Sequence, residues 1–261
     1  MRWIGNENGL APDPTWSTGS CEMGNGGHGP LPQGGDPDAP DWCPAEVDST
    51  LQANDAWFWL PPALNPLNSL AALVESYHAS RGRNSNWLLG LSPAPNGTLA
   101  PQHVALAEQL GAWLRGCYGA APAAAGAMAP GATALVVPVA GAGGAGHAIV
   151  DRVRLREDQT QGQIVRAYNI SATLVGGGSL LVASGSSVGA GKIDRFAQAV
   201  DATSLLLVTD AAPLGLSSRP STAPIREENC AQLQVHWEMR EWDKGSLPDR
   251  MPAATAAGSA P

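Results

Sequence analysis

Apolar positions in the first part of the chain follow the rhythm of a parallel α/β structure. They recur every three or four residues between 67 and 77, which predicts an amphipathic helix that begins at Asn65–Pro66 and ends at Gly82. A short apolar run over residues 86–92 predicts a strand buried on both faces. A second helix is predicted from Pro101 onward, with its apolar residues on one side. Helix, buried strand and helix in this order favour a parallel sheet or barrel.

The pattern changes after residue 117. Residues 118–146 are rich in Ala, Gly and Pro, a composition that buries little and predicts a linker, with a short strand over 134–139. From residue 147, short apolar stretches alternate with polar residues and Gly/Ser-rich turns, which predicts a β-sandwich over 147–250. Residues 251–261 are predicted to form a disordered tail. The expected fold class is α/β over residues 1–117, followed by an all-β domain.

Composition and charge exclude several classes of function. The formal net charge is −8 and only 15% of the residues are charged, so the basic face of a nucleic-acid-binding protein is absent. No segment approaches the roughly 18 apolar residues that a membrane span needs. The start Met1-Arg2 runs directly into polar sequence, so no signal peptide is present in this chain.

The cysteines and the N-glycosylation patterns are the features that relate to the cellular compartment of the protein. Cys21 and Cys43 flank one long loop and are able to pair in an oxidising environment, although two free thiols fit the sequence as well. Asn96 and Asn169 begin N-glycosylation acceptor patterns, which agree with a secretory route. None of the four cysteines has the spacing of metal ligands: Cys21, Cys43, Cys117 and Cys230.

Carboxylates near aromatic residues are the candidate chemical groups, because glycoside hydrolysis commonly uses two carboxyl groups. They are Glu7, Glu46, Asp48 and Asp55. An apolar wall beside Glu7, which has Trp3 and Trp16 near it in sequence, would raise its pKa and suit it to donate a proton. The alternatives are a solvated surface charge for Glu7 and a structural hydrogen bond at a strand end for Glu46.

Tryptophan is unusually frequent among the aromatic residues, with nine Trp against three Tyr and two Phe. Its broad apolar face suits stacking on sugars, although core packing remains the alternative for most of these residues. Trp57 and Trp59 bracket Phe58, and strand alternation would place the two indoles on one side and Phe58 on the other. We therefore treat Trp57 and Trp59 as candidate substrate-binding residues.

Several motifs, in order along residues 2–212, give the chain a family resemblance. The first motifs are Arg2-Trp3-Ile4-Gly5-Asn6-Glu7-Asn8-Gly9, Trp16-Ser17, Trp42-Cys43-Pro44-Ala45-Glu46-Val47-Asp48 and Asp55-Ala56-Trp57-Phe58-Trp59. They resemble the second half of the catalytic domain of the α-L-fucosidases of glycoside hydrolase family 29, in the plant-like subgroup. Later segments, such as Leu88-Leu89-Gly90-Leu91-Ser92-Pro93, look like subsequent parts of the same family.

The resemblance implies retaining hydrolysis of terminal α-L-fucosides through a covalent intermediate, with two carboxyl groups about 5 Å apart. It implies that Glu7 is the general acid/base, with Glu46 as the second candidate. Arg2 would reach the fucose hydroxyls and Trp57 would pack against the C5-methyl side of the sugar. The implied partner is a fucosylated glycan, and no metal or organic cofactor is implied.

The resemblance also implies a fold and a compartment. Residues 1–117 would be the C-terminal half of a (β/α) barrel, followed by an antiparallel β-sandwich. The protein would be secreted, extracellular or lysosomal/vacuolar, and its oligomeric state stays open.

The chain departs from the family pattern at several points, and these departures change what activity we expect of it. The family nucleophile lies in an Asp-Gly motif before the Arg-Trp pair, and this chain begins after that point. Gly90 stands where the family usually has Asn, and Gln52 stands where plant-like members often have Arg. We expect this chain to be part of a fucosidase that is inactive by itself. The alternative is a non-catalytic carbohydrate-binding or interaction protein.

Overall fold

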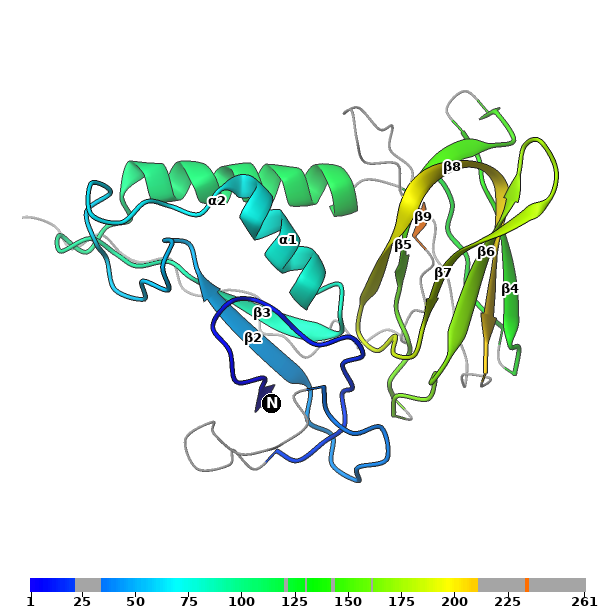
Figure 1. Cartoon of the computed structure of the whole chain (residues 1–261), viewed down its shortest axis with the longest axis horizontal. Helices are drawn as coiled ribbons and strands as arrows, with labels where there is room; N and C mark the ends of the chain where they lie inside the picture. The colour runs from blue at the N-terminus through cyan, green and yellow to red at the C-terminus, as the bar shows by residue number, and fades with distance from the viewer. Residues whose placement is uncertain are drawn as a thin grey trace, which may run out of the picture.

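The structure is a computed structural model, and its helices and strands form two parts (Figure 1). It describes residues 1–21, 34–119, 122–129, 131–141, 144–160 and 162–210, together with Leu233 and Gln234. The first part contains β1 (Arg2–Trp3), β2 (Ala45–Thr50), α1 (Leu70–Ser80), β3 (Ser85–Gly90), α2 (Pro101–Leu114) and the π-helical turn η2 (Arg115–Gly119). The second part contains β4 (Ala134–Pro138), β5 (Ala148–Leu155), β6 (Tyr168–Leu174), β7 (Ser179–Gly185), β8 (Lys192–Thr209) and β9 (Leu233–Gln234).

The first part is a parallel sheet with strand order β1-β2-β3. Helices α1 and α2 cover one face of this sheet (Figure 1). Because parallel strands run in one direction, the segments that follow β1, β2 and β3 all leave the sheet at the same edge. The apolar contact between the helices and the sheet is built from Leu51, Leu73, Leu106 and Leu110, with Trp87 and Leu89 packed against them.

The two helices begin at different kinds of signal. Helix α2 begins at Pro101, as predicted, with proline in the first turn. Helix α1 begins at Leu70, because the Ser69 hydroxyl accepts a hydrogen bond from the Ala72 amide and caps it. The predicted cap, Asn65, instead donates its side-chain amide to the Ala53 carbonyl at 2.7 Å. The apolar periodicity located this helix but not its first residue.

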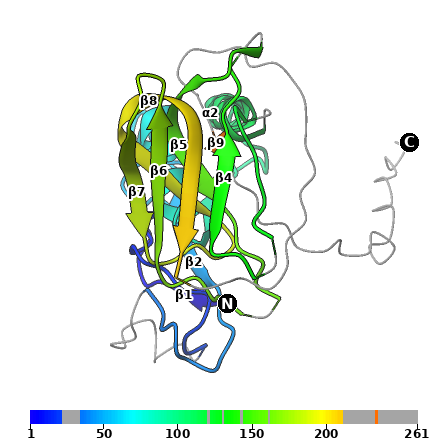
Figure 2. The same ribbon diagram turned by 90° about the vertical axis from the view of Figure 1, so that its right-hand side faces the viewer.

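The second part is one strongly curved sheet built around β8, which has 18 residues. The first half of β8 pairs antiparallel with β5, and the second half lies between β4 and β6, again antiparallel to both. Strand β7 continues the sheet beyond β6, and β9 pairs parallel to β5. Strand β8 arches over the sheet, so the sheet bends around its own core (Figure 1; Figure 2). The expected strands are present, and their pairing forms a single continuous sheet.

The segment expected to be a linker contributes to this core. Strand β4 lies within it and pairs with β8, close to the short strand predicted over 134–139. Met128 is fully buried and Ala124 is nearly so, both within the core of the curved sheet. These residues are therefore not the linker that the composition predicted. Although the segment has few apolar side chains, those of Ala124 and Met128 pack into the core of the curved sheet. The predicted tail, 251–261, lies outside the described residues.

The burial of Met128 predicts a large stability effect. Met128→Ala should lower the free energy of unfolding by about 2–5 kcal/mol, because it removes apolar contacts and leaves a cavity. Denaturant unfolding measures the loss. The matched control is Val136→Ala on β4, where the side chain is 60% exposed, and it should cost less than about 1 kcal/mol. Equal effects of the two substitutions would contradict the packing of Met128.

A buried polar network joins the two parts. The Asn84 side-chain amide donates to the Thr15 carbonyl and to the Ser17 hydroxyl, both at 3.0 Å. Gln163, from the second part, accepts from the Ser17 amide at 2.7 Å and donates to the Ser187 hydroxyl at 2.8 Å. These groups satisfy one another in a buried setting, so the segment after β1 is held against the curved sheet.

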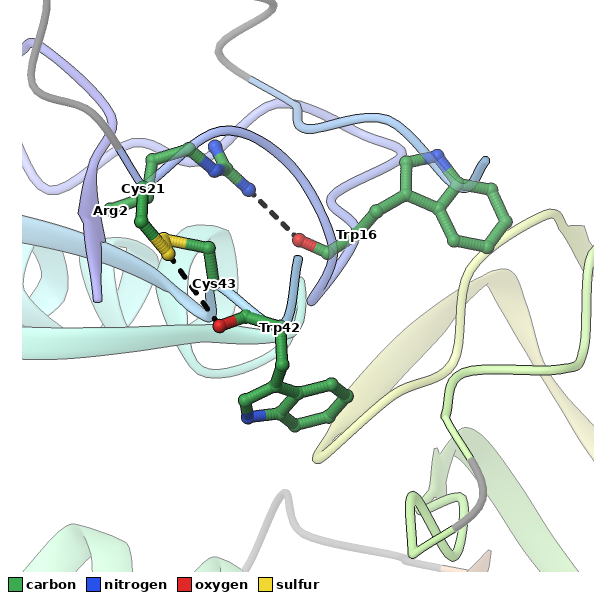
Figure 3. Close-up of a disulfide and its surroundings, with 5 residues drawn as sticks. All are labelled: Arg2, Trp16, Cys21, Trp42 and Cys43. Atoms are coloured by element: carbon green, nitrogen blue, oxygen red, sulfur yellow. Dashed lines mark hydrogen bonds between the residues drawn. A yellow bond between two sulfur atoms is a disulfide. The ribbon is translucent and has the colours of Figure 1, made fainter. Parts of the chain in front are cut away.

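A disulfide closes the loop between the first two strands. Cys21 and Cys43 are bonded to each other, with their Cα atoms 5.4 Å apart (Figure 3). Of the two possibilities that the sequence left open for this pair, the structure has the disulfide. Cys117 is likewise disulfide-bonded. Within the described ranges, no helix is long and apolar enough to cross a membrane.

Candidate active site

Two carboxylates lie on the face of the parallel sheet that α1 and α2 do not cover. On β2, Ala45 and Val47 are buried toward the apolar side, while Glu46 and Asp48 alternate with them and are half-buried. Trp3 lies beside Glu46 in the register of the sheet, and its indole N–H donates to Asp48 Oδ1 at 3.0 Å. Strand alternation therefore places both carboxylates on one surface.

A neighbouring amide orients Glu46. Asn86 lies opposite Glu46 on β3, and its side-chain amide donates to Glu46 Oε2 at 2.9 Å. This is the structural hydrogen bond that the sequence left as an alternative for Glu46. The bond fixes the carboxylate while leaving one oxygen available to other groups.

Glu7 belongs to the loop that follows β1, at the carboxyl edge of the sheet. Its Oε2 accepts a hydrogen bond from the Trp57 indole N–H at 2.6 Å. The loop is shaped locally, because the Asn6 side chain accepts from the Asn8 amide and donates to the Leu10 carbonyl. Glu7 itself is exposed, so its carboxyl group is open to a ligand from solvent.

The loop after β2 presents Trp57, and a buried glutamine shapes it. The Gln52 side-chain amide donates to the carbonyls of Ala56 and Phe58, and its oxygen accepts from the Leu60 amide. The predicted strand over residues 55–59 is absent, because these hydrogen bonds wrap the backbone around Gln52. The two indoles are half-buried and Phe58 is 87% exposed.

Trp57 is also supported by the end of β3. The Ser92 hydroxyl donates to the Trp57 carbonyl at 2.6 Å. A Cβ atom added at Gly90 would lie 2.8 Å from the Trp57 ring, closer than a real side chain could come. Gly90 thus allows the indole to lie directly over the end of β3. Loops after all three strands consequently meet at Trp57 and Glu7.

The three carboxylates influence one another electrostatically. Burial raises the pKa of Asp48, and the negative charges of Glu7 and Glu46 add to this effect, while the Trp3 hydrogen bond opposes it. Ionisation of Asp48 is therefore less favourable than that of a carboxyl group in water. Such a group of interacting carboxyls is able to hold and transfer a proton, the basic requirement of acid–base catalysis.

The structure brings together only some of the predicted site residues. Glu7 and Trp57 meet at the carboxyl edge of the sheet, whereas Glu46 lies near the start of β2, on the face that the helices leave uncovered. Arg2 faces the opposite side from Trp3, is 5% exposed, and donates to the Trp16 carbonyl at 2.8 Å (Figure 3). The Trp59 indole N–H is buried without a hydrogen-bond partner among the described residues.

Two residues of the site were not among the predicted ones, Trp3 and Asn86, and Asp48 was named only as a candidate carboxylate without a role. A signal for Asp48 was present, because Glu46 and Asp48 are two positions apart in a strand and must share a face. Trp3 and Asn86 could not be found this way, since only the strand register places them beside these carboxylates. The described residues hold no group of three or more metal-ligating side chains.

Comparisons of the sequence and of the fold with known proteins find similarity to α-L-fucosidases. No protein-family model matches the sequence. α-L-Fucosidase 1 of Arabidopsis thaliana is 32% identical over 112 residues, which cover 42% of this chain and 21% of the plant protein. A solved structure from Bacteroides thetaiotaomicron, named as an α-L-fucosidase, has a TM-score of 0.69 at 26% identity, over 82% of this chain and 49% of that chain.

A Ruminococcus gnavus family 29 fucosidase, solved in complex with fucose, has a TM-score of 0.67 at 19% identity, over 82% of this chain and 48% of that chain. That likeness shows a common fold. The chain spans about a fifth of the length of the plant relative and about half of the solved structures. In sequence it resembles the C-terminal portion of plant α-L-fucosidases, and its structural neighbours are glycoside hydrolase family 29 fucosidases.

Proposed function

We propose that this chain forms part of a retaining α-L-fucosidase that removes terminal α-L-fucose from glycans or glycoconjugates. The observation that supports it is the hydrogen bond between Trp57 and Glu7 at the carboxyl edge of a parallel sheet, with Asp48 and Glu46 on the uncovered face of the same sheet. Active sites of (β/α) barrels are built at this edge. An indole next to carboxyl groups suits a sugar, which offers an apolar face and a glycosidic oxygen to protonate.

In this proposal Glu7 is the general acid/base. Its carboxyl group is exposed on a loop and has a hydrogen-bond partner, Trp57, that also offers an apolar surface to a sugar ring. Glu46 is the second candidate, but it lies within β2 and is tied to Asn86. Asp48 would lie near both groups, with its pKa raised by burial and by their negative charges. Trp57 would pack against the sugar, while Arg2 and Trp59 would support the surrounding loops.

We further propose that residues 1–117 are the C-terminal half of a (β/α) barrel and that residues 147–250 belong to a β-sandwich domain. Support comes from the covering of only one sheet face by helices, together with polar and half-exposed side chains on the other, including Leu88 at 44% exposure. The remaining barrel strands would cover that face and supply the nucleophile. Secretion, or delivery to a lysosome or vacuole, would fit the disulfide between Cys21 and Cys43.

The test compares the chain with a completed enzyme. In the completed enzyme, the N-terminal barrel strands of the Bacteroides thetaiotaomicron relative precede residues 1–261. We expect no nitrophenol release from 4-nitrophenyl α-L-fucoside by the chain alone, because retention needs a carboxylate nucleophile opposite the acid/base. We expect turnover by the completed enzyme.

Two results would contradict parts of this proposal. Steady turnover by the chain alone, lost on replacement of Glu7, would show that no essential part is missing. A folded completed enzyme that binds fucose without hydrolysing fucosides would favour the non-catalytic carbohydrate-binding alternative.

A further inference from the structure

A small cavity with a strongly basic lining lies where the two parts of the molecule meet, away from the carboxylates described above. It has a volume of about 140 Å³ and is lined by three arginines, Arg81, Arg154 and Arg156, with Tyr77 and residues 190–191. The lining side chains come from separate elements: α1 and its C-cap supply Tyr77 and Arg81, and β5 and its extension supply the other two arginines. Both parts therefore contribute to one cavity.

The arginines are positioned by the fold. Arg154 and Arg156 are two positions apart, and Leu155 between them is fully buried in the core of the curved sheet. Alternation along the extended backbone thus turns both guanidinium groups away from the core, to the same side. Arg81 donates a hydrogen bond to the Ser85 carbonyl at 3.1 Å, which holds its side chain at the C-terminal end of α1.

Bringing these cations together opposes the ionisation of Arg154. Burial lowers the pKa of Arg154, and the charges of Arg156 and Arg81 lower it further. An anion placed among three guanidinium groups would reverse this effect. Guanidinium groups present N–H donors in a planar fork, which matches the oxygen atoms of phosphate and sulfate.

We propose that this cavity binds a phosphate or sulfate group. Its volume of about 140 Å³ compares with about 30 Å³ for one water molecule in the liquid. A tetrahedral oxyanion and a few water molecules therefore fit, whereas an oligosaccharide does not. The group is either a free ion or an ester whose remaining part stays outside the cavity.

Binding at this place links the two parts of the protein. The anion contacts Arg81 on one side and Arg154 and Arg156 on the other, so it is bound only when the parts are docked. Any ligand that binds only the docked state stabilises that state by mass action. Phosphate or sulfate is therefore expected to raise the melting temperature of the intact chain.

The experiment measures anion binding by the full chain and three variants. Isothermal titration with sodium sulfate and sodium phosphate, with sodium chloride at matched ionic strength, gives the affinity. Arg156→Gln and Arg81→Gln should each weaken sulfate or phosphate binding at least tenfold, which corresponds to about 1.4 kcal/mol. Arg115→Gln is the control, because it removes the same charge from an exposed residue of η2, and it should leave the affinity unchanged.

A second arm distinguishes the sources of the group. Glucose 6-sulfate that binds more tightly than inorganic sulfate would identify an ester ligand, and the reverse order would identify the free ion. Near-UV circular dichroism checks that each variant is folded. Should Arg156→Gln unfold the chain, Arg156→Lys keeps the charge without the planar fork and should still weaken binding. Absence of saturable binding by the unaltered chain, or equal weakening by Arg115→Gln, would overturn the proposal.

Discussion

Replacement of Glu7 by glutamine in the completed enzyme is expected to slow hydrolysis of unactivated fucosides by about 10²–10⁴-fold, the usual contribution of a general acid/base. Such leaving groups need a proton as the glycosidic bond breaks. Nitrophenol leaves readily without one, so the first step on 4-nitrophenyl α-L-fucoside should be largely spared. Comparison of kcat/KM for a natural fucoside and the aryl fucoside measures the difference.

Azide provides an independent readout of the same role. With Glu7→Ala, the fucosyl-enzyme lacks the base that activates water and should accumulate. Azide needs no base, so it should attack the anomeric carbon, release the enzyme carboxylate and give a fucosyl azide of retained configuration. Glu46→Ala is the matched control, because it removes the neighbouring carboxylate. If Glu46→Ala shows the azide effect and Glu7→Ala does not, Glu46 is the acid/base.

Much of the first part, with its parallel sheet, could be predicted from local patterns of apolar residues and proline. Buried strand β3 and helix α2 follow from apolar runs and from Pro101 in the first turn. The start of α1 could not be found in the same way, because Asn65 and Ser69 are both good caps. Which of them caps the helix depends on Asn65 reaching the Ala53 carbonyl, a contact that only the folded loop creates.

The sequence predicted those site residues that belong to recognisable motifs. It did not predict those that reach the site only through the register between strands. Glu7, Glu46 and Trp57 were predicted as site residues; Glu7 and Trp57 meet at the carboxyl edge, and Glu46 lies near the start of β2 on the uncovered face. Arg2 and Trp3 are adjacent, so one must point away from the site, and the sequence alone does not say which. In the structure Trp3 reaches Asp48, and Arg2 reaches the Trp16 carbonyl instead.

The structure explains one departure from the family pattern, the glycine at residue 90. Gly90 stands where the resemblance leads one to expect asparagine, and a Cβ atom at residue 90 would lie only 2.8 Å from the Trp57 ring. The position of Trp57 in this protein therefore requires glycine at residue 90. Sequence comparison marked the position as unusual, and only the contact explains it.

Two ion pairs connect the parallel part to β8, and their surroundings differ. Lys192 is 3% exposed, and its Nζ lies 2.6 Å from Asp13 Oδ1 and 3.8 Å from Asp194 Oδ1. The Arg195 and Glu75 side chains also pair at 2.6 Å, but they are 48% and 59% exposed. Exposed pairs contribute little because water and salt screen them, whereas a buried charge without its partner is costly.

Asp13 is 45% exposed, so only the lysine side of this pair is buried. Replacement of Lys192 by methionine should therefore lower the free energy of unfolding by about 1.5–3 kcal/mol, the usual contribution of hydrogen bonds to a charged group. Arg195→Met, the matched control on the same strand, should cost less than about 1 kcal/mol. Denaturant unfolding at neutral pH measures both.

A second substitution distinguishes two causes for the lost stability, the missing charge of Lys192 and its missing packing contacts. Asp194 is left beside Tyr168, whose hydroxyl donates to it at 2.6 Å, but without the nearby ammonium group. Burial already raises the pKa of Asp194, and Lys192 opposes that shift. Without Lys192, ionised Asp194 therefore becomes more costly to bury. Adding Asp194→Asn to Lys192→Met should recover part of the lost stability, because an amide needs no counter-charge. A double variant no more stable than Lys192→Met alone would show that the lysine acts through its packing.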